Sequence, residues 1–188
     1  MVAKPALIKK LDELGFAEKG YEWYLPLLHF STDTSAEFFQ RFRQFAVAVR
    51  DDDAFITELI RDLNWRPNVV GAGLAIVLRK YNLQKDAIWR IANLSWAGPQ
   101  LAVATALLDQ GNGESQLIQH LNEATDESNP KSVLSLYAAL GFLGSPAALR
   151  FERTQLFRTL TEKDSRDKSV EIAKRLWEAW RFVKPIQI

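Results

Sequence analysis

The sequence predicts an all-α protein built as a right-handed, curved stack of antiparallel helix pairs. The first observation is a sequence motif that recurs about every 32 residues. It places a capping-type residue and a proline before a run of small and branched apolar residues. Its three copies begin Asn64-Trp65-Arg66-Pro67, Ser95-Trp96-Ala97-Gly98-Pro99 and Asn129-Pro130. A period of that size is typical of stacked two-helix units. The second observation is the lack of strand signals, since no sustained alternation of apolar and polar residues is found.

Two helices are expected in the first 50 residues. Residues Pro5–Leu14 form an amphipathic pattern that ends at Gly15, a usual helix terminator. A cap-rich turn precedes a second helix, from Ser35 to about Arg50. We therefore expect one domain over residues 1–188, with an N-terminal helical cap at 1–34, helical repeats at 35–183 and a tail at 184–188.

The repeat region divides into alternating apolar and more polar helices. The expected ranges are 54–63, 65–80, 85–94, 99–108, 114–124, 130–143, 146–160 and 167–183. The segments Val69–Leu78, Leu101–Leu108 and Val133–Leu140 are apolar nearly all the way round, as a helix buried between neighbours on both sides must be. We expect these three to be the most buried and to pack as consecutive layers.

Residues 35–183 resemble the HEAT and armadillo class of α-helical repeats. The shared features are the length of the helix pairs, an apolar first helix and a proline near the start of that helix. The units here are shorter than the usual 40 or so residues of that class. The resemblance implies binding of proteins and, in some members, of nucleic acid.

Composition excludes several classes of protein. The 188 residues include no cysteine, which excludes disulfides, thiolate metal sites and cysteine nucleophiles. The 24 basic and 23 acidic side chains give a net charge of +1, whereas nucleic-acid-binding proteins concentrate far more positive charge. The longest apolar run, Val69–Leu78, is far short of the roughly 20 residues that span a membrane. We expect a cytoplasmic protein without a membrane or nucleic-acid partner.

No catalytic, metal or cofactor site is expected. His29 and His120 have no paired spacing and no motif around them, so they are interpreted as ordinary surface or half-buried histidines. The carboxylates of residues 51–53 could chelate a cation, but adjacent acids at a helix start diverge, and helix capping is the favoured interpretation.

One constellation suggests a binding surface: Trp65, Arg66 and Asn68, with their counterparts Trp96 and Gln100 in the next unit. Each sits near the start of an apolar helix, so stacking should align them along one rim. Tryptophan and arginine dominate binding hot spots. The alternative is that the tryptophans fill gaps between units and that Arg66 pairs with a local acid such as Asp62.

The sequence therefore favours a non-enzymatic module that binds another protein or a peptide through its repeat surface. The alternative is a nucleic-acid-acting enzyme on a HEAT-like scaffold, of the DNA glycosylase type. The last helix carries Trp177 and Trp180 on one side, so the chain is expected to be a monomer, with these rings sealing the final pair, or a weak homodimer through that helix.

Overall fold

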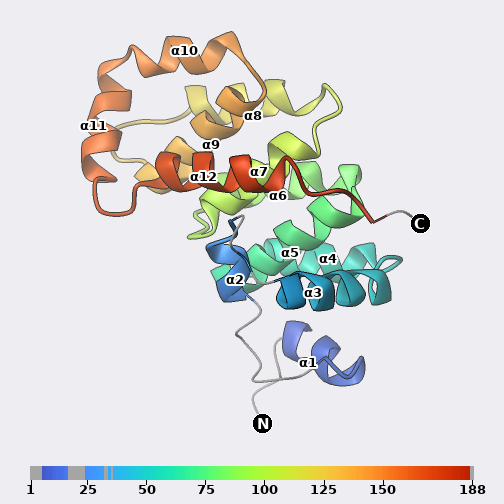
Figure 1. Cartoon of the computed structure of the whole chain (residues 1–188). Coiled ribbons are helices and arrows are strands. Elements are labelled where there is room, and N and C mark those ends of the chain that lie inside the picture. Colours follow the sequence, from blue (N-terminus) through green and yellow to red (C-terminus); the bar gives the residue numbers. More distant parts are fainter. Residues whose placement is uncertain (1–5, 17–23, 32–33, 35, 187–188) are drawn as a thin grey trace.

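The computed structural model describes residues 6–16, 24–31, 34 and 36–186 (Figure 1). Over these residues it is all-α, with twelve α-helices, one short 3-10 helix and no strand, so the predicted class is confirmed. The expected helix starts at Pro5 and Ser35, and the end of the tail at 187–188, lie outside the described residues. The helices are α1 (Ala6–Glu13), α2 (Tyr24–Leu28), α3 (Ala36–Ala48), α4 (Asp53–Arg61), α5 (Trp65–Leu78), η1 (Tyr81–Leu83), α6 (Gln84–Ala92), α7 (Gly98–Leu107), α8 (Gly113–Asn122), α9 (Pro130–Phe142), α10 (Pro146–Glu152), α11 (Gln155–Lys163) and α12 (Ser169–Trp180).

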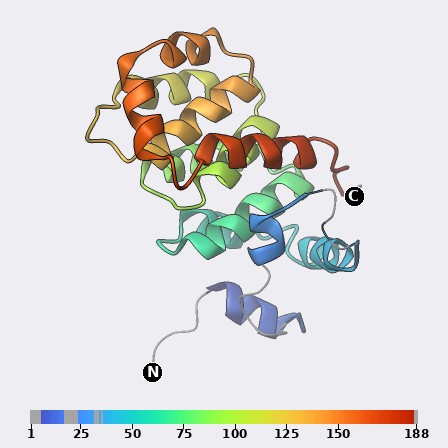
Figure 2. The ribbon, with the colours of Figure 1, turned by 60° about the vertical axis from the view of Figure 1, so that its left-hand side comes forward.

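The central helices form two parallel rows. Helix α7 packs between α5 and α9, which makes the inner row, and α6 packs between α4 and α8, which makes the outer row. Helices α2 and α3 lie on α5, and α12 lies across α7 and α9 (Figures 1 and 2). The three apolar helices thus follow one another in the predicted order.

The inner row explains why its helices are apolar all round. Every residue of α5 from Pro67 to Leu78 is buried. Small residues allow backbones to approach, since a Cβ added at Gly71 would lie 2.9 Å from the Ile60 side chain and 3.0 Å from its backbone nitrogen. Leu101 at the centre of the row is completely buried.

Several helix ends differ from the expected ones by one to three residues, and two differences change the loops. The single helix predicted over 146–160 is two helices, because the chain turns at Arg153 and the Thr154 hydroxyl caps α11 by accepting a hydrogen bond of 3.1 Å from the Phe157 amide. Helix α4 ends at Arg61. Leu63, the last residue of the expected range 54–63, therefore lies beyond the helix and is 90% exposed.

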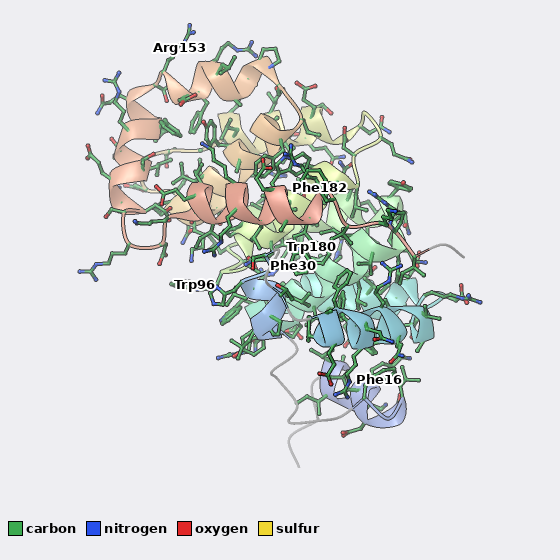
Figure 3. All side chains as sticks on the ribbon, in the orientation of Figure 1. Phe16, Phe30, Trp96, Arg153, Trp180 and Phe182 are labelled. Atoms are coloured by element: carbon green, nitrogen blue, oxygen red, sulfur yellow. The ribbon has the colours of Figure 1, made fainter. Side chains whose placement is uncertain are left out.

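The last helix covers the middle of the stack and does not close its end. Trp180 of α12 stacks on Phe30 with 4.2 Å between ring centroids (Figure 3), and Trp177 stacks on Phe142 at 4.7 Å. Beyond α12, the Ile186 amide donates a hydrogen bond to the Val77 carbonyl. Both tryptophans therefore pack within the chain, Trp177 on α9 of the expected final pair but Trp180 on Phe30, outside that pair. The homodimer through α12 stays a prediction.

Candidate functional site

Helices α5, α7 and α9 all begin at one edge of the stack. We call this edge the rim and define it by the three loops that lead into these helices, residues 62–64, 93–97 and 123–129. A short polar side chain in each loop accepts a hydrogen bond from a backbone amide at or just before the helix start. Asn64 accepts a hydrogen bond from the Arg66 amide, Ser95 from the Ala97 amide and Asn129 from the Ser132 amide.

Asn68 is the centre of a buried network under the rim. Its side-chain nitrogen donates to the carbonyls of Leu59, Ile60 and Asp62 at 2.9–3.0 Å, which closes the end of α4. Its side-chain oxygen accepts from Arg90 at 3.3 Å and from Ser95 at 2.6 Å. Asn68 is completely buried, so its role in the structure is to hold two loops together.

Arg90 joins the same network from α6. Its guanidinium donates to the carbonyls of Leu63 and Asn93 at 3.2 and 2.6 Å. The residue is only 4% exposed, and burial lowers the pKa of its guanidinium from the usual value. Because a buried cation needs several partners, Arg90 fixes the positions of both loops on which exposed residues are carried.

Gln100 also lies inside the protein. Its side-chain nitrogen donates to the Leu28 carbonyl at 3.2 Å, which ties α7 to α2, and its side-chain oxygen has no partner among the described residues. A surface at the rim therefore excludes Asn68 and Gln100, the two amides of the predicted constellation.

Trp65 and Arg66 lie together at the start of α5. The Trp65 ring meets Tyr24 edge to face, with 5.2 Å between centroids. The Arg66 guanidinium lies over both rings, 4.9 Å from the Trp65 centroid and 5.3 Å from that of Tyr24. The described contacts of Arg66 are thus with aromatic rings, a geometry that gives about 0.5–1 kcal/mol at exposed sites.

Trp96 contacts a different group of residues. It is 64% exposed and lies at the outer edge of the molecule (Figure 3). Its ring carries the Lys131 ammonium at 4.4 Å from the centroid, and Lys131 also pairs with Asp167 at 3.2 Å. The structure therefore joins Trp65 to Arg66 and Trp96 to Lys131, in two neighbouring clusters.

Sequence reasoning missed two exposed leucines of the rim. Leu63 is 90% and Leu94 61% exposed. Leu94 also has a φ of 64°, a left-handed conformation that is unfavourable for a bulky residue. An exposed leucine held in such a conformation gains little from packing, which points to a use at the surface. The signal available in the sequence was a leucine directly before the polar residue of the first two loops, Leu63 before Asn64 and Leu94 before Ser95.

The carboxylates of residues 51–53 diverge as expected for capping. Asp52 accepts from the Phe55 amide at 3.0 Å, and Asp53 pairs with Lys80 at 2.6 Å. Asp51 pairs with its neighbour Arg50. Within the described ranges no group of three or more His, Asp or Glu side chains is placed to hold a metal ion.

Comparison with known proteins gives no relative: no protein-family model, curated protein or solved structure matches this chain. In the described part of the chain, none of the helices combines the length and the apolar character that crossing a bilayer requires.

Proposed function

We propose that the protein is a non-enzymatic module that binds another protein or a peptide through the rim. The observation that carries the proposal is the row of exposed apolar side chains on successive loops, Leu63 followed by Leu94 and Trp96. Fully burying a leucine contributes about 1.5–3 kcal/mol, and tryptophan is enriched among residues that dominate binding.

The buried network supports this assignment. Asn68 and Arg90 bind the backbone of both loops, so the exposed side chains are held before any partner arrives. Preorganisation of this kind reduces the entropy lost on binding. Arg66 and Lys131 flank the row and add cationic groups that already lie over aromatic rings.

We further propose that the pairs α4–α5, α6–α7 and α8–α9 form a right-handed, HEAT-like superhelix in a single domain. The two parallel rows support this architecture. The cysteine-free composition supports a reducing compartment such as the cytoplasm. A nucleic-acid-acting enzyme ranks second, because phosphate binding requires available cations and Lys131 is paired with Asp167.

The test compares protein capture from the native host by three immobilised forms of the chain. The double variant Leu63→Ser/Trp96→Ser removes the apolar row, and Leu149→Ser on α10 is the matched control, since Leu149 is also 61% exposed. We expect one protein to be retained by the wild type and the control and lost by the double variant, with unchanged melting temperatures. Equal capture by all three forms would contradict the proposal.

A further inference from the structure

The rim carries a groove between its second and third loops. A hollow beside Trp96 and a cavity of about 220 Å³ that opens to solvent are both lined by Leu94 and Asn129, so the two are adjacent. Leu94 belongs to loop 93–97 and Asn129 to loop 123–129. The cavity therefore opens beside the exposed apolar row.

Part of the cavity suits a carbon chain. Its apolar lining residues are Ala92, Leu94, Ala124, Val133 and Leu136. Val133 and Leu136 belong to α9 and are almost completely buried. Since a single water needs only about 15 Å³, the cavity has room for several carbon atoms of a side chain.

Three of the polar lining residues have little left to offer a ligand. The hydroxyl of Ser128 and the side chain of Asn129 each accept a hydrogen bond from a backbone amide, at 2.9 and 3.1 Å. The Ser132 hydroxyl oxygen is itself buried. The other two polar lining residues are His120 and Glu123.

Glu123 supplies the carboxylate of the cavity. It pairs with His120, whose Nδ1 lies 3.4 Å from a carboxylate oxygen, and its side chain is still 60% exposed. The Gln119 side chain also donates to it at 3.3 Å. Because an uncharged imidazole and an amide do not neutralise a carboxylate, Glu123 keeps its negative charge uncompensated whenever His120 is unprotonated.

The rest of the third loop adds negative charge. Asp126 and Glu127 are exposed and have no ion pair among the described residues. Of the nearby cations, Lys163 donates to the Asp126 carbonyl and Lys131 is paired with Asp167. The loop is therefore acidic, and charge complementarity favours a basic group on the partner.

We propose that the groove binds a basic side chain, lysine or arginine, of the bound protein or peptide. The proposal rests on the proposed function and names the chemistry of the group that the partner inserts. Lysine and arginine bury their carbon stems along apolar surface and keep the charged end at its polar edge. Here the stem lies against Leu94, Val133 and Leu136, the cation lies beside Glu123, and neighbouring apolar residues of the partner contact Trp96.

The same charges disfavour other side chains. A carboxylate of the partner would meet Glu123, Asp126 and Glu127, which repel it as like charges. An uncharged side chain would gain burial against the apolar lining but no attraction to the loop. A lysine should therefore bind more tightly than an uncharged chain of the same length.

The test is a titration of the full chain at pH 8, where histidine is largely uncharged, followed by amide chemical shifts in two-dimensional NMR. The probe is N-acetyl-lysine methylamide. The matched analogues carry norleucine, which has the same four-carbon stem without the ammonium, or glutamate. We expect shifts at residues 94 and 120–136, with lysine binding about two- to fivefold more tightly than norleucine, the weight of an exposed ion pair, and glutamate binding least. Salt at about 1 M should remove the preference for lysine, since it screens exposed charges.

Two variants locate the charge that matters. Glu123→Gln should lose the preference for lysine over norleucine, whereas Glu114→Gln, the same change at the other end of α8, should keep it. Thermal unfolding checks that both variants are folded. No shifts with any probe, equal binding of lysine and norleucine to the wild type, or a preference that survives Glu123→Gln would overturn the proposal. Because the titration needs no protein partner, these outcomes are distinct from failure of the capture experiment.

Discussion

Both edges of the helix stack have a polar network beside their loops, but they differ in the side chains that they expose. At the rim, Asn68 and Arg90 bind loop carbonyls from below, and Leu63, Leu94 and Trp96 are exposed above them. The opposite edge, defined by residues 79–83, 108–112 and the start of α4 at Asp53, also has a polar network.

Ionised groups dominate that opposite network. Asp53 pairs with Lys80, and Asp109 accepts from Gln84 at 2.7 Å and from the Gly113 amide at 2.9 Å. Among the described residues of the opposite edge, Tyr81 is the most exposed large apolar residue, at 40%. Polar networks therefore hold the loops at both edges of this stack. What distinguishes the rim is its row of strongly exposed apolar residues.

The largest expected effect comes from Asn68, on which the rim depends. Asn68→Leu keeps the size of the side chain but leaves the carbonyls of Leu59, Ile60 and Asp62 without this donor and removes one acceptor of the buried Arg90. We expect a loss of about 3–5 kcal/mol in the free energy of unfolding, since each buried polar group left without a partner costs about 1–3 kcal/mol. Denaturant unfolding measures it.

Gln100→Leu is the matched control for Asn68. It removes one hydrogen bond to Leu28 and also an oxygen that already lacks a partner among the described residues. The expected loss is therefore about 1 kcal/mol or less. Equal losses in the free energy of unfolding would show that Asn68 contributes no more to stability than Gln100 does.

Acid should weaken the opposite edge before the rim. Hydrogen bonds from Lys80 and then Asn82 lower the pKa of Asp53. Burial alone would raise the pKa of Asp109, but the donors Gln84, Gly113 and Gly111 outweigh it and the net shift is downward. A lowered pKa stabilises the fold above the unfolded value of about 3.9, and this stability is lost as the pH falls through the folded value.

The measurement is unfolding free energy against pH for the wild type and Asp109→Asn. The variant should lose about 1–2 kcal/mol near neutrality and show a shallower decline in acid. Asp164 acts in the opposite direction, since burial raises its pKa, which is why the difference between the two proteins is the informative quantity. Parallel curves would show that Asp109 does not contribute to acid sensitivity.

Leu94 offers a smaller effect of opposite sign. Leu94→Gly removes a side chain held at a φ of 64°, so it should stabilise the protein by about 1 kcal/mol while weakening partner capture. Leu149→Gly, within helix α10, should instead cost about 1 kcal/mol. Thermal unfolding of both variants decides this, and a destabilised Leu94→Gly would show that the exposed leucine packs usefully.

The smallest change in stability is expected at Trp96. Trp96→Ser removes a ring that is 64% exposed and contacts Lys131, so the free energy of unfolding should change by no more than about 0.5–1 kcal/mol. The main effect of Trp96→Ser is expected on partner binding. A melting temperature that falls as far as in Asn68→Leu would instead make Trp96 part of the packing between units.

The helix starts of the inner row could be predicted because their signals are local. Asn64 and Asn129 cap α5 and α9 within a few residues of themselves, and Pro130 begins α9 as expected. The break between α10 and α11 was missed, because Arg153 and Thr154 fit a continuous helix as well as a turn. Only the Thr154 hydroxyl, by capping α11, decides between the two.

The candidate site was predicted in part for a similar reason. Trp65 and Arg66 were chosen by their position near a helix start, and they begin α5, while Trp96 lies in the loop before α7. Such a position could not show that Asn68 and Gln100 point inward, because that depends on where α4 and α2 pack. Leu94 was assigned to a helix end, since the apolar pattern continues through it and its left-handed backbone has no sequence marker.

The place of α12 has a consequence for the chain during its synthesis. An ordinary repeat array grows by adding one unit to the next, so an unfinished chain is already a shorter version of the complete one. Here α7 and α9 emerge from the ribosome well before the helix that covers them, and Trp180 meets Phe30 only after α12 has been synthesised. A prematurely terminated chain would expose its apolar middle to chaperones and proteases, and would not persist as a smaller working module.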